Sequence, residues 1–167
     1  KSEVIESIKE DKREFYTKKW EDCEEHLGVE NFKELFSHIR AIYAKRKAEE
    51  SILKEIIKYG DPSKNGSRFI EKELEPFSEA YGWLINCDYE AKSYAESINH
   101  HIKWLNKIEN KDWIPPALLY FSVNKGESEK IYHFIKALEQ LTLGIEILGY
   151  GINSRLERFA NIMKLIG

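Results

Sequence analysis

Apolar residues recur at helical spacing along almost the whole chain, and no other feature constrains its fold as strongly. Residues three or four positions apart lie on one face of an α-helix, so such a repeat marks a helix with one buried side. The clearest example is Phe32, Leu35, Phe36, Ile39, Ile42 and Tyr43. Convincing alternation of apolar and polar residues, as in a half-buried strand, is absent. The sequence therefore predicts an all-α protein, an irregular bundle of about seven or eight helices.

Turn-forming and capping residues divide this pattern into segments. A first helix is predicted over residues 2–26 and ends before Gly28, and Asn31 begins a capping pair for the second helix. Residues 60–67 are the clearest loop, and Pro76 is expected to kink or split the helix that follows. Further helices are expected over residues 89–108, from the Pro115-Pro116 pair through Phe121, over residues 128–148, and from Ser154 to the end.

The composition is that of a single globular domain. The chain has 167 residues, of which 42% are hydrophobic and 33% are charged, and this is enough for a sizeable core. Its formal net charge is −3, so attraction of the whole surface to nucleic acid is not indicated and only a local basic patch is left open. We therefore expect residues 1–167 to form one all-α domain.

Cysteine content and hydropathy indicate a cytoplasmic protein. Only Cys23 and Cys87 are present, which suits a reducing compartment better than a disulfide framework. No apolar run approaches the ~20 residues that span a membrane, and the N-terminal segment is charged where a signal peptide needs an apolar core. The chain opens on Lys1 without a methionine and closes directly after an apolar run, so we expect it to be a fragment of a larger protein.

No segment carries a complete metal or catalytic motif. Cys23 and His26 share a helix face but lack the second ligand pair of a zinc site, so a packed cysteine beside a surface histidine is favoured. His100 and His101 are adjacent on a helix and point about 100° apart, which prevents them from sharing one ion. We therefore expect no catalytic residue, no metal and no cofactor in this chain.

One basic run lacks acidic residues. Between His38 and Lys47 it carries Arg40, Lys45, Arg46 and Lys47. This is the best candidate for a surface that contacts phosphates. Cations at a helix C-terminus also interact favourably with the helix dipole, so a purely structural role is at least as well supported.

A second pair of arginines follows a glycine-containing turn near the end of the chain. Arg155 and Arg158 share one helix face close to a helix N-terminus, where the helix dipole disfavours cations. We expect them to pair with acidic residues or to contact an anion, and an interhelical ion pair is favoured. Gly149 and Gly151 are expected to allow the turn of a helical hairpin. Its second helix would pack inward through Leu156, Phe159, Ala160 and Met163.

Three segments resemble the helical region of the GmrSD-type restriction endonucleases, and together they cover most of the chain. The first matches that family's tryptophan, acidic Leu-Gly step, Phe-x-x-Leu-x-x-x-x-Arg helix and following basic residues with Trp20, Leu27, Gly28, Phe32, Leu35, Arg40 and residues 45–47. The second, residues 113–119, resembles its Trp-x-Pro-x-Leu-Leu segment with one additional residue before the two leucines. The third matches its final pair of helices with residues 133–139 and 153–159.

This family combines a ParB-like, nucleotide-dependent domain with an HNH nuclease domain, and characterised members target modified phage DNA. The chain lacks the Asp-Gly-Gln-Gln-Arg signature and any HNH-type array, so no catalytic residue carries over. The resemblance implies a non-catalytic domain of a modification-dependent, phage-defence restriction protein. Such a domain would position the nuclease domains, transmit the nucleotide state, or contact DNA through Arg40, Lys45, Arg46 and Lys47. Its partners would be DNA and the other domains of the parent protein.

Two other functions stay open. A stand-alone helical module that binds a protein would expose an apolar patch. Candidates for this patch are Trp83, Trp104, Trp113 and Tyr150, although aromatic side chains are more often packed in the core. A helical hydrolase or nuclease would require His101, His133 and carboxylates to converge in one cleft.

Overall fold

The computed structural model describes residues 1–166, and this part of the chain is 78% helical without a strand. It confirms the all-α class. When the unbroken helical run over residues 62–86 is counted as one helix, these residues hold nine helices, eight of them of seven residues or more, against about seven or eight predicted. The elements in chain order are α1 (Ser2–Glu6), α2 (Glu10–Leu27), α3 (Val29–Ala44), α4 (Ile52–Tyr59), the 3-10 helix η1 (Pro62–Asn65), α5 (Gly66–Phe69), the π-helix η2 (Ile70–Leu74), α6 (Glu75–Asn86), α7 (Ala95–Lys107), α8 (Ile114–Val123), α9 (Ser128–Ile147) and α10 (Ile152–Ile166).

The prediction of one helix over residues 2–26 is wrong, because this segment forms two helices, α1 and α2, with a break between them. The chain breaks after Glu6, and the Arg13 guanidinium of α2 donates hydrogen bonds to the carbonyl oxygens of Glu6 and Ile8, both at 2.9 Å. These bonds satisfy carbonyl groups that a helix end leaves without partners. The capping role of Asn31 is also wrong. Its side chain donates to the Leu27 carbonyl oxygen at 3.0 Å from inside α3.

The segment predicted as a loop over residues 60–67 is also helical, because η1 and the start of α5 occupy most of it. From α5 the chain runs through η2 into α6 without a break, so Pro76 does not split the helix. The turn of the π-helix η2 is wider than an α-helical turn, because the Glu75 N–H donates to the carbonyl oxygen of Ile70, five residues back. Proline has no N–H to donate, and here it lies in the first turn after the π-helix, where the backbone pattern changes.

Two later helices begin at other residues than predicted. The helix expected over residues 89–108 starts only at Ala95, after turns that include Tyr94 at φ 65°. Asn99 holds these turns, because its side chain bonds to both the N–H and the carbonyl oxygen of Tyr89, at 2.8 and 3.0 Å. The last helix starts at Ile152, which places Ser154 inside its first turn.

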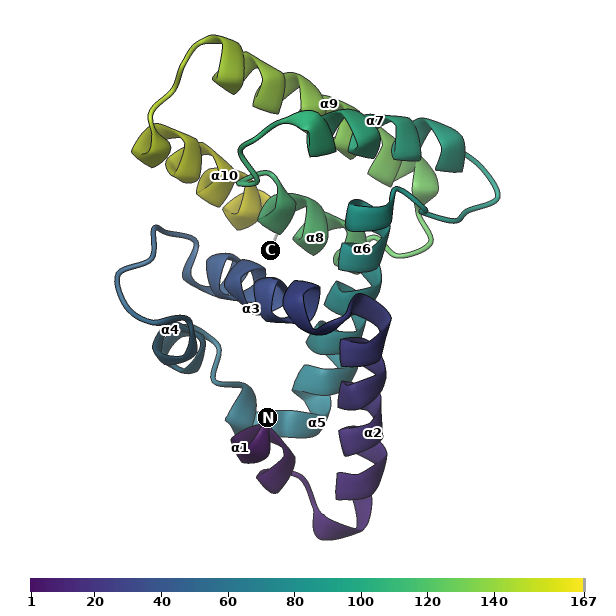
Figure 1. Ribbon diagram of the computed structural model, residues 1–167, viewed down its shortest axis with the longest axis vertical. Helices are drawn as coiled ribbons and strands as arrows, with labels where there is room; N and C mark the ends of the chain where they lie inside the picture. The colour runs from purple at the N-terminus through teal and green to yellow at the C-terminus, as the bar shows by residue number, and fades with distance from the viewer. Residues whose placement is uncertain (167) are drawn as a thin grey trace.

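The helices form an elongated body in which α6 joins two groups (Figure 1). The group at one end holds α1, α2, α4 and α5, the group at the other holds α7 to α10, and α3 crosses between them. Helix α7 packs mainly on α9, while α8 contacts α3, α6 and α10. One continuous apolar core runs through both groups, and Trp113, Tyr81 and Phe121 are among its largest fully buried side chains.

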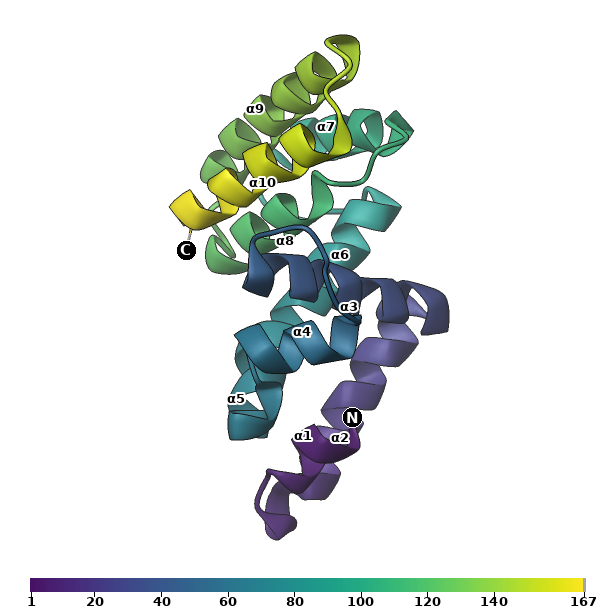
Figure 2. The ribbon, with the colours of Figure 1, turned by 90° about the vertical axis from the view of Figure 1, so that its left-hand side faces the viewer.

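The predicted hairpin at the end of the chain is only partly correct. Helix α10 packs mainly on α8 and also contacts α3, whereas α9 packs on α7, so α9 and α10 are consecutive without forming a close pair. In Figure 2 α10 lies in front of α7, with α9 above it and α8 below it. Phe159, Ala160 and Met163 are buried as predicted, and Leu156 is half-buried.

We predict that Gly66→Ala destabilises the protein, because α1 packs directly on the Gly66 backbone. A Cβ atom there would lie 2.2 Å from the Val4 carbonyl oxygen and 2.6 Å from Ser7 Oγ. The clash is expected to lower the free energy of unfolding by about 1–3 kcal/mol in urea denaturation.

Gly144→Ala is the matched control for this prediction, since a Cβ atom at Gly144 meets nothing within 4 Å inside α9. Helix propensity should then raise the free energy of unfolding by about 0.5–1 kcal/mol. Equal stability of the Gly66→Ala protein and the wild type would show that α1 does not hold the described position.

Candidate functional site

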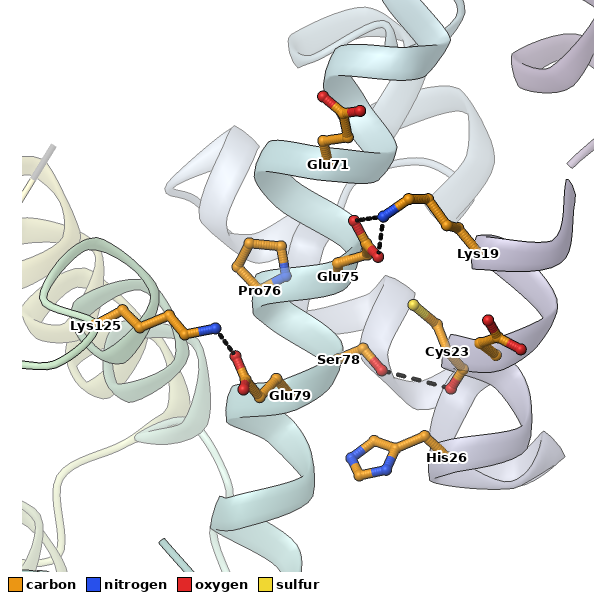
Figure 3. A pocket seen from close by; sticks show the side chains of 10 residues that line it. Lys19, Cys23, His26, Glu71, Glu75, Pro76, Ser78, Glu79 and Lys125 are labelled. Atoms are coloured by element: carbon orange, nitrogen blue, oxygen red, sulfur yellow. Dashed lines mark hydrogen bonds and ion pairs between the residues drawn. The ribbon is translucent and has the colours of Figure 1, made fainter. Parts of the chain in front are cut away.

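Cys23 and His26 line a pocket beside α6 in which three of the four acidic side chains have partners (Figure 3). Glu75 accepts hydrogen bonds from Lys19 at 2.7 and 2.8 Å, and Glu79 pairs with Lys125. Burial raises the pKa of the Cys23 thiol, which makes the reactive thiolate scarcer. Nowhere in residues 1–166 do three or more His, Cys, Asp or Glu side chains form a group that could hold a metal. The pairs in this pocket join α6 to Lys19 of α2 and to Lys125 in the turn after α8.

The adjacent histidines point to different partners, as their spacing predicts. His101 Nδ1 bonds to Glu139 of α9, while His100 Nε2 accepts a hydrogen bond from Trp104 Nε1 at 3.1 Å within α7. His133 lies exposed on α9. His101 therefore joins two helices, and His100 remains at the surface of one.

The assignment of Arg40 to a surface patch is corrected, because Arg40 is 8% exposed. Its Nε bonds to the carboxylate of Glu55, which is 1% exposed, and its Nη2 donates to the Arg46 carbonyl oxygen at 2.6 Å. The other Glu55 oxygen accepts the backbone N–H groups of Glu49 and Glu50, at 2.8 and 3.1 Å. This buried pair fixes both ends of the segment between α3 and α4. Arg40 is thus a structural residue.

The surroundings of Glu55 strongly favour its charged form. The backbone N–H of Glu49 contributes most, with the Arg40 guanidinium and the N–H of Glu50 adding to it, and together they lower the pKa of Glu55 to about 2 although burial opposes this. A carboxylate that accepts several hydrogen bonds holds its charge in this way. Glu55 is therefore charged at neutral pH.

The other three residues of the basic run do reach the surface. Lys45 ends α3 in a left-handed conformation, φ 49°, and is half-buried. Arg46 is exposed and pairs with Glu49. Lys47 is exposed, and its Nζ lies 3.3 Å from Asn153 Oδ1 of α10. Because all three follow the last turn of α3, the interaction with the helix dipole and the surface role are compatible.

These cations form one wall of a cleft whose other wall is α10, and we call it the α3–α10 cleft. In Figure 2 the loop that follows α3 passes beside α10. The outer part is lined by Lys45, Arg46, Lys47, Asn153, Leu156, Glu157, Ala160, Asn161 and Lys164. The inner part is mainly apolar and shares Arg46, Lys47, Leu156 and Ala160 with the outer part. Each part has a volume of about 310 Å³.

The outer part has an excess of positive charge. Among the ion pairs within residues 1–166, none joins Lys45, Lys47 or Lys164 to a carboxylate. The Nζ of Lys164 lies 3.4 Å from Asn161 Oδ1, a neutral group. Glu157 is the one acidic residue in this wall. The arrangement can hold an anion with several negative oxygens.

A buried histidine belongs to the inner part. His38 is 8% exposed, and its Nε2 has no hydrogen-bond partner within the described residues. The nearest carboxylate oxygen, from Glu34, is 4.0 Å away, and the ring packs edge-on against Tyr81 with centroids 5.2 Å apart. Burial lowers the pKa of His38 to about 4, so the ring is neutral at pH 7.

The two arginines of the last helix have different partners. Arg155 Nε bonds to Asp112 Oδ2 at 3.1 Å, and this ion pair ties α10 to the residues just before α8. Arg158 Nη2 donates to Tyr150 Oη at 3.1 Å, and its guanidinium lies 4.7 Å from the centre of that ring. Arg155 thus pairs with an acidic residue as expected, but the pair is not interhelical, because Asp112 lies in the turn before α8. Arg158 is exposed and stacks on an aromatic ring.

Comparison of this chain with models of protein families, with curated proteins and with solved structures finds no match. Within residues 1–166, every helix is too short or too polar to cross a membrane.

Sequence reasoning found one wall of the cleft and missed the other. Lys164 and Asn153 lie far along the chain from Lys45, and no local motif connects them. The available signal was helical spacing, because Lys164 follows the buried Ala160 by four residues and so lies on the same side of α10. His38 had no local signal, since the pattern of α3 does not show what covers it.

We predict that Arg40→Leu lowers the free energy of unfolding by about 3 kcal/mol at pH 7, because Glu55 is left as a buried charge without its cation. Urea denaturation measures the change. Arg40→Leu combined with Glu55→Gln should regain part of the loss, since a neutral amide still accepts the two backbone N–H groups.

Arg46→Leu is the matched control, because Arg46 pairs with Glu49 at the surface and should change the stability by about 0.5 kcal/mol or less. Similar losses from both arginines would contradict the structural role of the buried pair.

We predict that His38 makes the protein acid-sensitive in a defined pH range. The folded pKa of about 4 lies below the unfolded value of 6.5, so its contribution to stability is full above pH 6.5 and declines as the pH falls toward 4. Between pH 7.5 and 5 the wild type should lose about 2 kcal/mol that a His38→Phe protein keeps.

Urea denaturation at the two pH values measures this difference. His133→Phe removes an exposed histidine and serves as control, with the full loss of stability expected. A His38→Phe protein that loses as much stability as the wild type would refute the prediction.

Proposed function

We propose that this chain is a non-catalytic helical domain of a DNA-targeting restriction protein and that it contacts DNA through the outer part of the α3–α10 cleft. One observation carries the proposal. Lys45, Lys47 and Lys164 come from two distant segments of the chain and meet on one cleft without a carboxylate partner among the described residues. Their convergence supports a polyanionic ligand, and the DNA backbone is the polyanion that the resemblance implies.

Lysine contacts to phosphates position a protein on DNA without reading its sequence. Arg46 adds a fourth cation, although Glu49 competes for its charge. The net charge of −3 disfavours binding elsewhere, so binding would be confined to this cleft. A contact of this kind suits a domain that positions catalytic domains located elsewhere in the parent protein.

We predict that changing Lys45, Lys47 and Lys164 together to alanine weakens binding to a short DNA duplex at least about tenfold at low salt. The slope of log affinity against log salt should fall in magnitude by about 2–3, because fewer counterions are released on binding when phosphate contacts are lost. Fluorescence anisotropy between 50 and 200 mM salt measures both quantities.

The control changes Lys9, Lys12 and Lys18, three exposed lysines near the N-terminus, to alanine. It therefore alters the net charge by the same amount as the test variant. It should bind DNA like the wild type. Equal weakening by both triple variants, or binding that does not depend on salt, would disprove the proposal.

A second candidate, a protein-interaction module, is favoured by an exposed apolar corner between α9 and α10. Ile147 is 83% exposed, Leu148 71% and Ile152 57%. Of the aromatic residues considered for this role, Trp113 is fully buried and Trp104 is 46% exposed. The two candidates differ in their response to salt, because association through an apolar surface persists at concentrations that displace a protein from DNA.

A further inference from the structure

The two parts of the α3–α10 cleft differ in chemistry, and their ligand must match both. The inner part is walled by Ala41 of α3, Pro115 of α8, and Phe159 and Met163 of α10. The outer part carries the three lysines described above. Since Arg46 and Lys47 line both parts, one ligand can place an anionic group in the outer part and an apolar group in the inner part.

Polar side chains in the lining of the inner part narrow the choice of apolar group. Ser37, Lys111 and Asp112 line it together with His38. His38 is buried, and its Nε2 lacks a partner within the described residues, which leaves one hydrogen-bonding group unsatisfied. An alkyl chain would cover the polar side chains of the lining without making hydrogen bonds to them, at an energetic cost. A heteroaromatic ring offers apolar faces for Ala41 and Pro115 together with donors and acceptors at its edge. The inner volume of about 310 Å³ lies at the lower end of the range for small-ligand sites.

We propose that the inner part of the α3–α10 cleft binds the base of one unpaired nucleotide, whose phosphate lies on the lysines of the outer part. The proposal deepens the proposed function and rests on it for the role of those lysines. The nucleotide comes either from a single strand or from a free nucleoside monophosphate, and both present the same base and phosphate.

An unpaired base is required because bases in a duplex are stacked and paired. Burying one base face against apolar side chains adds binding energy that phosphate contacts alone do not supply. The cleft should therefore bind a single strand more tightly than a duplex of equal length. It should also bind a mononucleotide more tightly than inorganic phosphate.

The test uses the 167-residue chain and four probes, which are inorganic phosphate, deoxyadenosine monophosphate, a single-stranded DNA of about twelve nucleotides and the corresponding duplex. Calorimetry measures the first two and fluorescence anisotropy the last two. The expected result is about tenfold tighter binding of the single strand than of the duplex, or of the mononucleotide than of phosphate, and the pair that differs identifies the source.

Ala41→Phe fills the inner part without changing any charge, and Ala137→Phe makes the same change at an exposed position of α9. Ala41→Phe should remove the preference for the nucleotide or the single strand and leave binding of duplex and phosphate unchanged. Ala137→Phe should behave like the wild type. Should the circular dichroism of Ala41→Phe show loss of fold, His38→Phe takes its place and is expected to reduce the preference severalfold.

The outcomes separate this inference from the proposed function. A preference that survives in the folded Ala41→Phe protein, or in His38→Phe where that protein is used, overturns the inference. So does equal affinity for single strand and duplex combined with equal affinity for mononucleotide and phosphate. If duplex binding still falls in the triple lysine variant, the proposed function stands without the inference. Absence of binding to all four probes overturns both.

Discussion

The buried ion pair of Arg40 and Glu55 determines whether residues 45–51 have a fixed position. Arg40 holds the Arg46 carbonyl oxygen, and Glu55 holds the N–H groups of Glu49 and Glu50. A segment of seven residues between two helices is otherwise expected to be mobile and to expose its backbone to water. The wall of the α3–α10 cleft that carries Lys45 and Lys47 consists of this segment, so the cleft depends on the pair.

Burying such a pair to hold a loop carries a large desolvation free energy. Both charges leave water, and hydrophobic side chains of the same volume often stabilise a protein as well or better. The hydrogen bonds of the pair are directional. The planar guanidinium and the carboxylate oxygens bond to backbone groups at fixed positions along the segment, which orients its backbone. We infer that it maintains one arrangement of the loop. The basic side chains beyond it then face α10 in a defined order.

The sequence was sufficient for the class of fold and insufficient for the ends of its helices. Helical spacing is a property of each segment, and the buried faces of α3 and α10 follow from it. The ends of the helices depend on side chains that act across breaks, such as Arg13, which donates to the Glu6 carbonyl oxygen at the end of α1. The role of Arg40 at the site was also not predictable from its neighbours in the sequence. Arg40 belongs to a basic run, but its partner Glu55 lies on the next helix, and neighbouring residues do not reveal which cation turns inward.

The π-helix between α5 and α6 has a consequence for how this fold tolerates changes in chain length. A π-helical turn holds one more residue than an α-helical turn, and that residue rotates everything after it by about 100° relative to an unbroken α-helix. Glu71 meets Tyr16 of α2 and Glu73 meets Tyr43 of α3, while Glu75, beyond the turn, meets Lys19 of α2. Deletion of a single residue here would leave a more regular helix that faces the wrong neighbours. At this point the fold depends on the number of residues as much as on their identity.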